Sequence, residues 1–315
     1  GLAFTGIAVA ATYFLARSYL PRRFAVTIAA TTAASPVLLV ISASFMTDSF
    51  ALAGQVGALV LAAYAMSKRG IGRTFMWWFA IAVALWAFSV REFSAITIGA
   101  IALFALVTNA LPRWQRISSI SVLVIGTVAI AYWRTLQVTE TPSTLLFDLD
   151  RFTYIAALPL TLGLLALPTL AWIRPLVLVR GFDRNRWIAF GVTWAVATTL
   201  IGSGGVFIAG NYFQQVPPYS SVIPGTPEGV YPLWLWGVVV ASGLLGAVIG
   251  TAALTDLFLS MKMTTCGRLR MWAERPGLFL AASYSAGSAL SLTAAPFVAG
   301  IPIYDRCLLG LVAVA

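Results

Sequence analysis

The sequence contains no histidine and few charged residues, and both shortages exclude classes of protein. Without histidine, His-based catalytic triads and His-ligated zinc sites are excluded, so acid or base chemistry falls to carboxylates, Tyr or Lys. Only 10% of the 315 residues are charged, whereas a soluble domain carries roughly 25%. Hydrophobic residues make up 60%, and the mean hydropathy is +0.91. The chain is therefore expected to fold in a lipid bilayer.

Cysteine is also scarce. Cys266 and Cys307 are the only two, and no CxxC spacing occurs. A disulfide framework and a cysteine-based metal motif are therefore not indicated. We interpret both cysteines as ordinary residues of a membrane protein.

Long apolar runs fill most of the chain. A membrane-crossing helix needs about 20 mostly apolar residues, so we divide the sequence at charges, proline clusters and polar runs. About eleven segments result: 1–16, 24–45, 50–66, 75–90, 94–108, 117–133, 152–172, 187–207, 233–255, 277–297 and one from 307 onward. This pattern predicts an all-α, polytopic transmembrane helical bundle that forms a single domain over residues 1–315.

Two of these divisions decide the topology. As one helix, residues 75–108 would be about 50 Å long, so we expect the chain to fold back at Arg91. The polar residues 46–49 are expected to form a tight turn between two spans, which places Asp48 at a membrane surface.

The basic residues predict the orientation. Sixteen of the 20 Lys and Arg residues fall in alternate loops. The opposite side holds only Arg91, Arg134, Arg151 and Arg306. Because short cytoplasmic loops retain positive charge, the loops that hold the sixteen basic residues are expected to be cytoplasmic. The protein is then expected to be an integral protein of the cell membrane, with its other face outward. The net charge of +10 is thus mainly a topogenic signal, and no nucleic-acid partner is expected.

The acidic residues collect on the opposite side. Seven of the ten lie there: Asp48, Glu92, Glu140, Asp148, Asp150, Glu228 and Asp305. Acidic residues contribute little to orientation, so their accumulation points to an outward-facing polar site. The alternative is that residues 140–150 simply belong to a solvated outer loop.

Asp48 lies in the first candidate motif, the turn "SFMTDS". A carboxylate at this depth can orient a sugar hydroxyl, or it can hold an arginine that binds phosphate. The alternative is structural: Asp48 or Ser49 caps the helix that follows.

Arg91 and Glu92 form the second candidate motif, in "SVREFS". The planar guanidinium group matches phosphate oxygens, so Arg91 is suited to hold a lipid phosphate or pyrophosphate. The alternative is an ion pair of Arg91 with Glu92 or Asp48 that only fixes the turn.

The third candidate motif, Tyr304, Asp305 and Arg306, directly precedes the last expected span. These residues can bind a substrate at the outer face. Equally, Asp305 and Arg306 can anchor a helix end, with Tyr304 as an aromatic residue of the membrane interface.

In their order along the chain, "SFMTDSFAL", "SKRG", "SVREFSAITIG" and "YDRCLLGLV" resemble the GT-C superfamily of polyprenyl-phosphate-sugar-dependent glycosyltransferases. The closest branch is similar to the protein mannosyltransferases and aminoarabinose transferases. The resemblance covers residues 1 to about 110 well and the middle of the chain weakly. It implies a helical enzyme that transfers a sugar from a lipid phosphate to an acceptor on the outer face. The implied partners are membrane lipid, the polyprenyl-phosphate-linked donor and a glycan, lipid or protein acceptor.

The resemblance also implies roles for individual residues. Asp48 and Arg91 match its catalytic positions, and Glu92, Tyr304, Asp305 and Arg306 are assigned to substrate binding. Its general base would lie before Gly1, so we interpret the chain as a fragment truncated at both ends. No cofactor or metal site is indicated, and a divalent cation is left open.

Two other functions remain open from the sequence. Glu92 stands where the family frequently has Gln, Cys307 where an aromatic residue follows the Arg, and Gly310 where Pro is expected, so a non-catalytic relative is one alternative. A transporter or flippase of a lipid-linked or anionic solute is the other. That function favours ionisable residues deep within spans and repeated broken helices, and neither is evident in the sequence.

Overall fold

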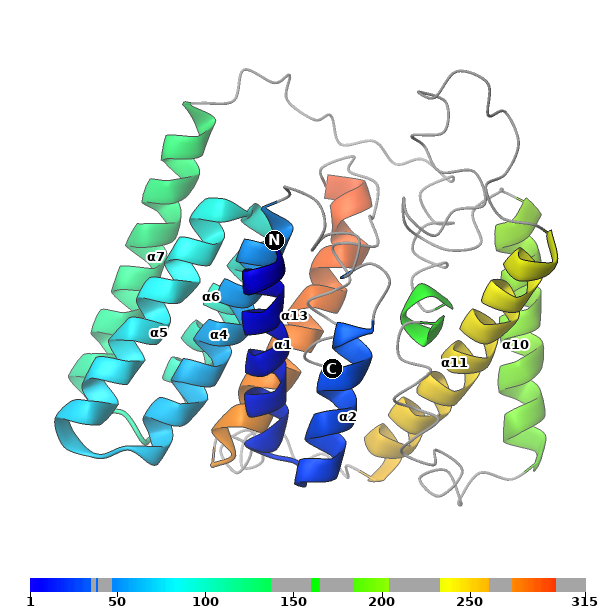
Figure 1. The fold of residues 1–315 in the computed structure, drawn as a ribbon, viewed down its shortest axis with the longest axis horizontal. Coiled ribbons are helices and arrows are strands. Elements are labelled where there is room, and N and C mark those ends of the chain that lie inside the picture. The colour runs from blue at the N-terminus through cyan, green and yellow to red at the C-terminus, as the bar shows by residue number, and fades with distance from the viewer. Residues whose placement is uncertain are drawn as a thin grey trace. The chain divides into compact units, whose positions relative to one another are not determined.

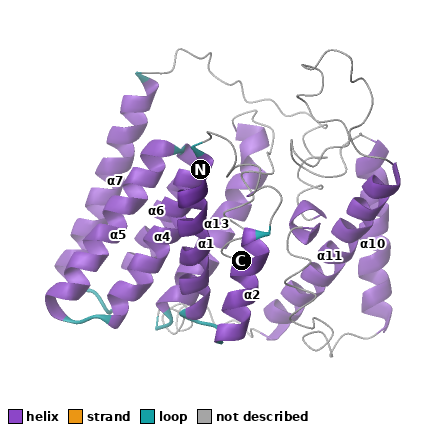
Figure 2. Cartoon of the chain, viewed as in Figure 1, coloured by secondary structure: helices purple, strands orange, loops and turns teal. Residues whose placement is uncertain are grey.

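The structure is a computed structural model that describes residues 1–34, 38, 47–136, 160–164, 184–203, 233–260 and 274–298. Every regular element in these ranges is helical, as Figure 1 and Figure 2 show. The labelled helices are α1 (Leu2–Arg17), α2 (Arg22–Ala33), α4 (Asp48–Ser67), α5 (Gly70–Val90), η1 (Glu92–Ser94), α6 (Ala95–Val107), α7 (Arg113–Thr135), α10 (Arg184–Ser203), α11 (Leu233–Ser260) and α13 (Pro276–Val298). The expected all-helical character is confirmed for this part of the chain.

Three of the helices, α4, α5 and α7, are long and apolar enough to cross a membrane. Shorter apolar helices lie at Leu2–Arg17, Glu92–Val107, Trp187–Ala197 and Gly237–Gly250. A helix satisfies its own backbone N–H and C=O groups, which is what a bilayer interior requires of a spanning segment. The protein is therefore a membrane protein. The number of eleven spans and the GT-C fold stay predictions.

The division at Arg91 is confirmed, whereas the expected turn at residues 46–49 is described only from Thr47 onward, with Asp48 and Ser49 inside a helix. Helix α5 ends at Val90 and α6 begins at Ala95, so the chain does fold back around Arg91. Helix α4 begins at Asp48, directly after a turn residue, Thr47. Of the other expected spans, residues 152–172 are described only at 160–164, and the segment from 307 lies outside the described residues.

Two helices begin four or five residues earlier than the charge pattern predicts. Helix α5 begins at Gly70 instead of residue 75, and α7 begins at Arg113 instead of residue 117. The charge pattern places these helix starts after the arginines, but a long arginine side chain can lie along a helix end while its charged group stays in a polar layer. Pro112, with a φ of −57°, directly precedes α7, and its fixed backbone suits the start of a helix.

The chain divides into two compact units. Unit 1 comprises Gly1–Pro142, Met263–Ser291 and Leu309–Ala315, and unit 2 comprises Ser143–Lys262 and Leu292–Leu308. The single domain expected from the sequence stays a prediction.

Helix α4 is the central helix of unit 1. It packs against α1 and α5 and also contacts α6 (Figure 1). Its most apolar window is 67% buried, whereas that of α7 is only 11% buried. Gly54 of α4 allows the close approach of α5, because a Cβ there would lie 2.8 Å from the Ala87 Cβ. Helix α7 therefore exposes most of its apolar surface, while α4 is enclosed.

The start of α5 is held at a sharp chain reversal. Gly70 has a φ of +58°, in the left-handed region that glycine adopts without a steric penalty. Arg73 donates from Nε to the Lys68 carbonyl at 2.9 Å and from Nη1 to the Ala110 carbonyl at 2.6 Å. One guanidinium group thus joins the α4–α5 turn to the α6–α7 turn. These turns carry basic residues expected to face the cytoplasm, and we call this the basic end of unit 1.

In unit 2, α10 contacts α11, and residues 160–164 lie close to α11. A Cβ at Gly246 would clash with the Gly163 carbonyl oxygen, so only glycine allows this close approach. The packing here is backbone against backbone, as is common between helices in membranes.

Candidate functional site

Asp48 is buried at the first turn of α4, where its carboxylate meets the N-terminal end of the helix dipole. The residue is 4% exposed. The N-cap residue, Thr47, makes no side-chain capping hydrogen bond. Ser49 Oγ, also buried, has no hydrogen-bond partner among the described residues. Capping by Ser49, one of the structural alternatives, is therefore not observed.

Arg91 pairs with Asp48 across the fold. Its Nε lies 2.8 Å from Asp48 Oδ1. Its N–H is not aligned as a hydrogen bond, so the pair is a charge contact. The Arg91 side chain is 31% exposed and that of Asp48 only 3%. The start of α4 and the end of α5, which are far apart in the sequence, thus meet at one end of unit 1. We call this the acidic end.

The backbone at Arg91 explains why the chain turns there. Its φ of −147° and ψ of 132° are extended, which ends α5. Its N–H still donates to the Ala87 carbonyl at 3.0 Å, and its carbonyl accepts from the Ser94 N–H at 3.1 Å. Those two bonds connect the end of α5 to η1, so the arginine is held by backbone on both sides.

Glu92, assigned to substrate binding from the sequence, pairs with Arg134 at the end of α7. The distance from Arg134 Nη1 to Glu92 Oε2 is 2.5 Å. Arg134 also donates to the carbonyls of Val90 at 3.1 Å and Ser89 at 3.4 Å, which satisfies the end of α5. Partial burial opposes ionisation of Glu92, but its own backbone N–H and the Arg134 charge outweigh that effect, so its pKa lies below the ordinary value.

A buried polar chain that sequence reasoning missed lies within the helices near this end. Gln55 of α4 donates from Nε2 to Ser94 Oγ at 2.8 Å, and its Oε1 accepts from the Tyr284 hydroxyl of α13. All three residues are at most 2% exposed. The available signal was a single amide within the apolar run of α4, because polar side chains in spans usually bond across helices.

Thr97 adds a further buried polar group at the start of α6. Its hydroxyl is fully buried and has no hydrogen-bond partner among the described residues. Together with Ser49, it leaves two unsatisfied hydroxyls, one on α4, which carries Asp48, and one on α6, which follows the turn at Arg91. Buried polar groups of this kind are costly unless a ligand or water satisfies them.

The structure brings together only part of the predicted site. Asp48, Arg91 and Glu92 lie at the acidic end of unit 1, with Arg91 and Glu92 contacting different partners. Tyr304, Asp305 and Arg306 lie outside the described residues. Within the described ranges, no three side chains of the His, Cys, Asp and Glu types are grouped so that they could hold a metal ion.

This arrangement can bind an anion. Asp48 lies against Nε of Arg91, and among the described residues no hydrogen bond is observed from the terminal nitrogens, Nη1 and Nη2. A guanidinium group held from one side presents its remaining donors in a fixed plane, which suits phosphate oxygens.

No protein-family model, curated protein or solved structure matches this chain.

Proposed function

We propose that the protein is an integral membrane glycosyltransferase of the GT-C type, which transfers a sugar from a polyprenyl-phosphate donor to an acceptor on the outer face of the cell membrane. The observation that carries this proposal is the Asp48–Arg91 pair, in which a buried carboxylate holds a partly exposed arginine. The resemblance of the surrounding motifs supports the same function. The proposed outward face follows from the distribution of Lys and Arg.

In the proposed reaction, the acceptor hydroxyl gives its proton to a carboxylate and its oxygen bonds to the anomeric carbon of the sugar. The bond from that carbon to the phosphate oxygen breaks, and the electron pair leaves with the polyprenyl phosphate. Arg91 stabilises the negative charge that develops on this phosphate, with Arg306 as a second cation. Asp48 orients Arg91 and does not act as the base.

The first test is Arg91→Ala in the full-length protein, measured as sugar transfer from a polyprenyl-phosphate donor in isolated membranes. We expect transfer to fall by at least about 100-fold at normal membrane abundance, because charge stabilisation of a leaving group is worth several kcal/mol. Arg22→Ala is the matched control, since Arg22 is an exposed arginine at the basic end. Full transfer by Arg91→Ala would contradict the proposal.

A second variant separates folding from chemistry. Arg91→Ala leaves the Asp48 carboxylate without its cation, which can itself destabilise the protein. The double variant Asp48→Asn with Arg91→Gln keeps two polar side chains in contact but carries no charge. We expect it to reach the membrane at normal abundance and to lack transfer. Solute movement across sealed vesicles by the wild type, without sugar transfer, would instead indicate a transporter and overturn the proposal.

A further inference from the structure

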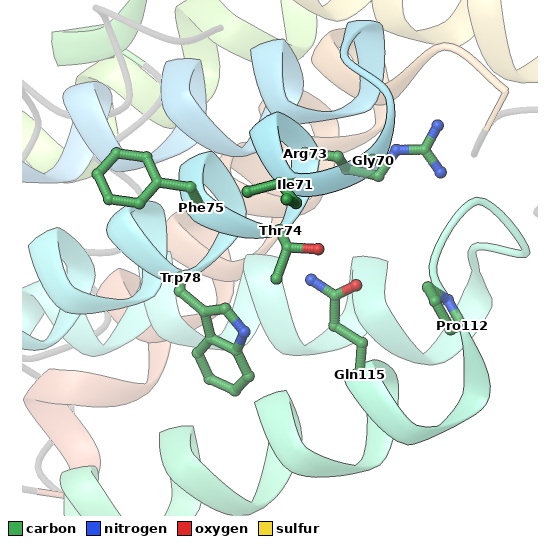
Figure 3. Close-up of a pocket in the computed structure, with 8 residues that line it drawn as sticks. All are labelled: Gly70, Ile71, Arg73, Thr74, Phe75, Trp78, Pro112 and Gln115. Carbon is green, nitrogen blue, oxygen red and sulfur yellow. The ribbon is translucent and has the colours of Figure 1, made fainter.

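A groove of about 680 Å³ opens at the basic end of unit 1, between the first turns of α5 and α7. Arg73 lies in the first turn of α5 and Arg91 directly follows its last residue. The two arginines are 18 positions apart, which corresponds to about 27 Å along a helix. The groove is therefore distant from the Asp48–Arg91 pair. Figure 3 shows Phe75 and Trp78 of α5 on one side and Gln115 of α7 on the other.

Gln115 supplies a polar group that no described residue satisfies. The residue is 1% exposed, and its Nε2 has no hydrogen-bond partner among the described residues. In Figure 3 its amide points into the groove, towards Thr74. A buried amide donor is costly when it is unpaired, so an acceptor oxygen bound in the groove would remove that cost.

Apart from Arg73 and Thr74, the rest of the groove lining is apolar, and part of it is exposed. Ile71 is 88% exposed and Phe75 is 64% exposed, although both lie at the start of a membrane-spanning helix. Large exposed apolar side chains at this position are suited to contact hydrocarbon. The groove thus combines an apolar wall with a buried hydrogen-bond donor, Gln115 Nε2, that has no partner among the described residues.

The charge around the groove has one sign. Arg73 lies at its rim, and the two turns beside it, residues 67–73 and 108–116, also contain Lys68, Arg69, Arg113 and Arg116 but no Asp or Glu. Two guanidinium groups are fixed by backbone carbonyls: Arg73 by Ala110, and Arg116 by Thr108 at 3.2 Å. A polar group bound here lies in a positive potential, which selects an anion.

We propose that this groove binds one anionic phospholipid of the adjacent leaflet. Its acyl chain lies along Ile71, Phe75 and Trp78, and a phosphate or glycerol oxygen accepts a hydrogen bond from Gln115 near Arg73. The combination of hydrocarbon wall, buried donor and fixed cations fits a molecule that has both a chain and a charged head. The inference does not depend on the proposed glycosyl transfer, because the groove lies at the other end of α5.

The test compares lipids on the purified full chain in neutral detergent. Melting temperature and native mass spectra are recorded with phosphatidylglycerol, with phosphatidylcholine of the same chains, and with glycerol 3-phosphate. We expect phosphatidylglycerol to raise the melting temperature and to remain bound in the mass spectrometer, with at least about tenfold tighter apparent binding than phosphatidylcholine. Glycerol 3-phosphate, which lacks the chains, is expected to have no effect at equal concentration.

Two near-isosteric variants locate the site. Gln115→Leu removes the donor, and Thr74→Val removes the hydroxyl that faces it; each is expected to weaken phosphatidylglycerol binding at least about fivefold. Because Gln115→Leu removes an unsatisfied buried amide, its lipid-free melting temperature should equal or exceed that of the wild type, which separates binding from folding. Thr27→Val is the matched control, since Thr27 bonds the Arg23 carbonyl within α2 at 3.0 Å, outside the groove.

Four outcomes would overturn the inference. Equal binding of phosphatidylcholine would show that any chain suffices, and an equal effect of glycerol 3-phosphate would show a soluble anion as the ligand. Unchanged lipid binding in both Gln115→Leu and Thr74→Val would place the lipid elsewhere. A lipid-free dimer that Gln115→Leu abolishes would show that a second copy of the chain occupies the groove. None of these results alters the expectation for Arg91→Ala in sugar transfer, so the two proposals fail separately.

Discussion

The acidic end of unit 1 contains two arginine–carboxylate ion pairs, and their carboxylates differ in solvent exposure. Arg91 meets a carboxylate that is 3% exposed, whereas the Glu92 side chain that meets Arg134 is 68% exposed. Solvent screens the second pair and leaves it little net stabilisation, while loss of one partner from the first leaves a charge in a buried position. The first pair is therefore the one on which both folding and the proposed chemistry depend.

Glu92 gives a pH dependence that can be measured. Its folded-state pKa is lowered, so the stability it contributes is present above its unfolded pKa and is lost as the pH falls through the folded value. We expect the wild type to melt at a higher temperature than Glu92→Gln at pH 7. The difference should decrease below about pH 4.3, the ordinary pKa of Glu, and vanish at lower pH. Melting curves of both proteins between pH 3 and 7 test this, and a difference that does not change with pH would contradict it.

At the scale of elements, the α4–α5 interface depends on one glycine. A Cβ at Gly54 would lie 2.8 Å from the Ala87 Cβ and 3.0 Å from the Trp86 ring, so Gly54→Ala should destabilise the protein by about 1–3 kcal/mol through overpacking. Gly57, one turn later on α4, has nothing within 4 Å of a Cβ, so Gly57→Ala is the matched control. We expect the control to be neutral or slightly stabilising, because Ala favours a helix over Gly. Melting temperatures in the same detergent compare them, and equal values would contradict the predicted packing.

The elements show which features a sequence can predict here. The reversal at Arg91 was predictable, because one helix of that length would exceed the bilayer. The starts of α5 and α7 were not, since Arg73 and Arg116 bond backbone carbonyls across the turns and so lie inside helices. The Asp48–Arg91 pair was predictable only as one of two alternatives. The hydrogen bonds from Gln55 to Ser94 and from Tyr284 to Gln55 join residues far apart in the sequence, and no local pattern predicts which distant side chain reaches Gln55.

At the scale of the whole molecule, the orientation in the membrane is the prediction that the proposed function most requires. Ser67 and Thr135 are exposed residues at the ends of α4 and α7, at the basic and acidic ends of unit 1. We would place single cysteines there, Ser67→Cys and Thr135→Cys, with Cys266 and Cys307 replaced by Ser. A membrane-impermeant maleimide on intact cells should label Thr135→Cys at once and Ser67→Cys only after permeabilisation. The reverse pattern would place the Arg91 end in the cytoplasm and exclude an outward-facing site.

The bond between Gln55 and Tyr284 also has a consequence for biogenesis. The two residues are 229 positions apart, and ribosomes add roughly 5 to 20 residues per second, so the partner of the Gln55 carbonyl emerges roughly 10 to 50 seconds later. During that interval, α4 is in the bilayer with an amide oxygen that its own neighbours leave unsatisfied, a costly state in hydrocarbon. The early helices must therefore be kept apart or held by the insertion machinery until α13 arrives. Tyr284→Phe should then lengthen the time that newly made chains remain associated with that machinery.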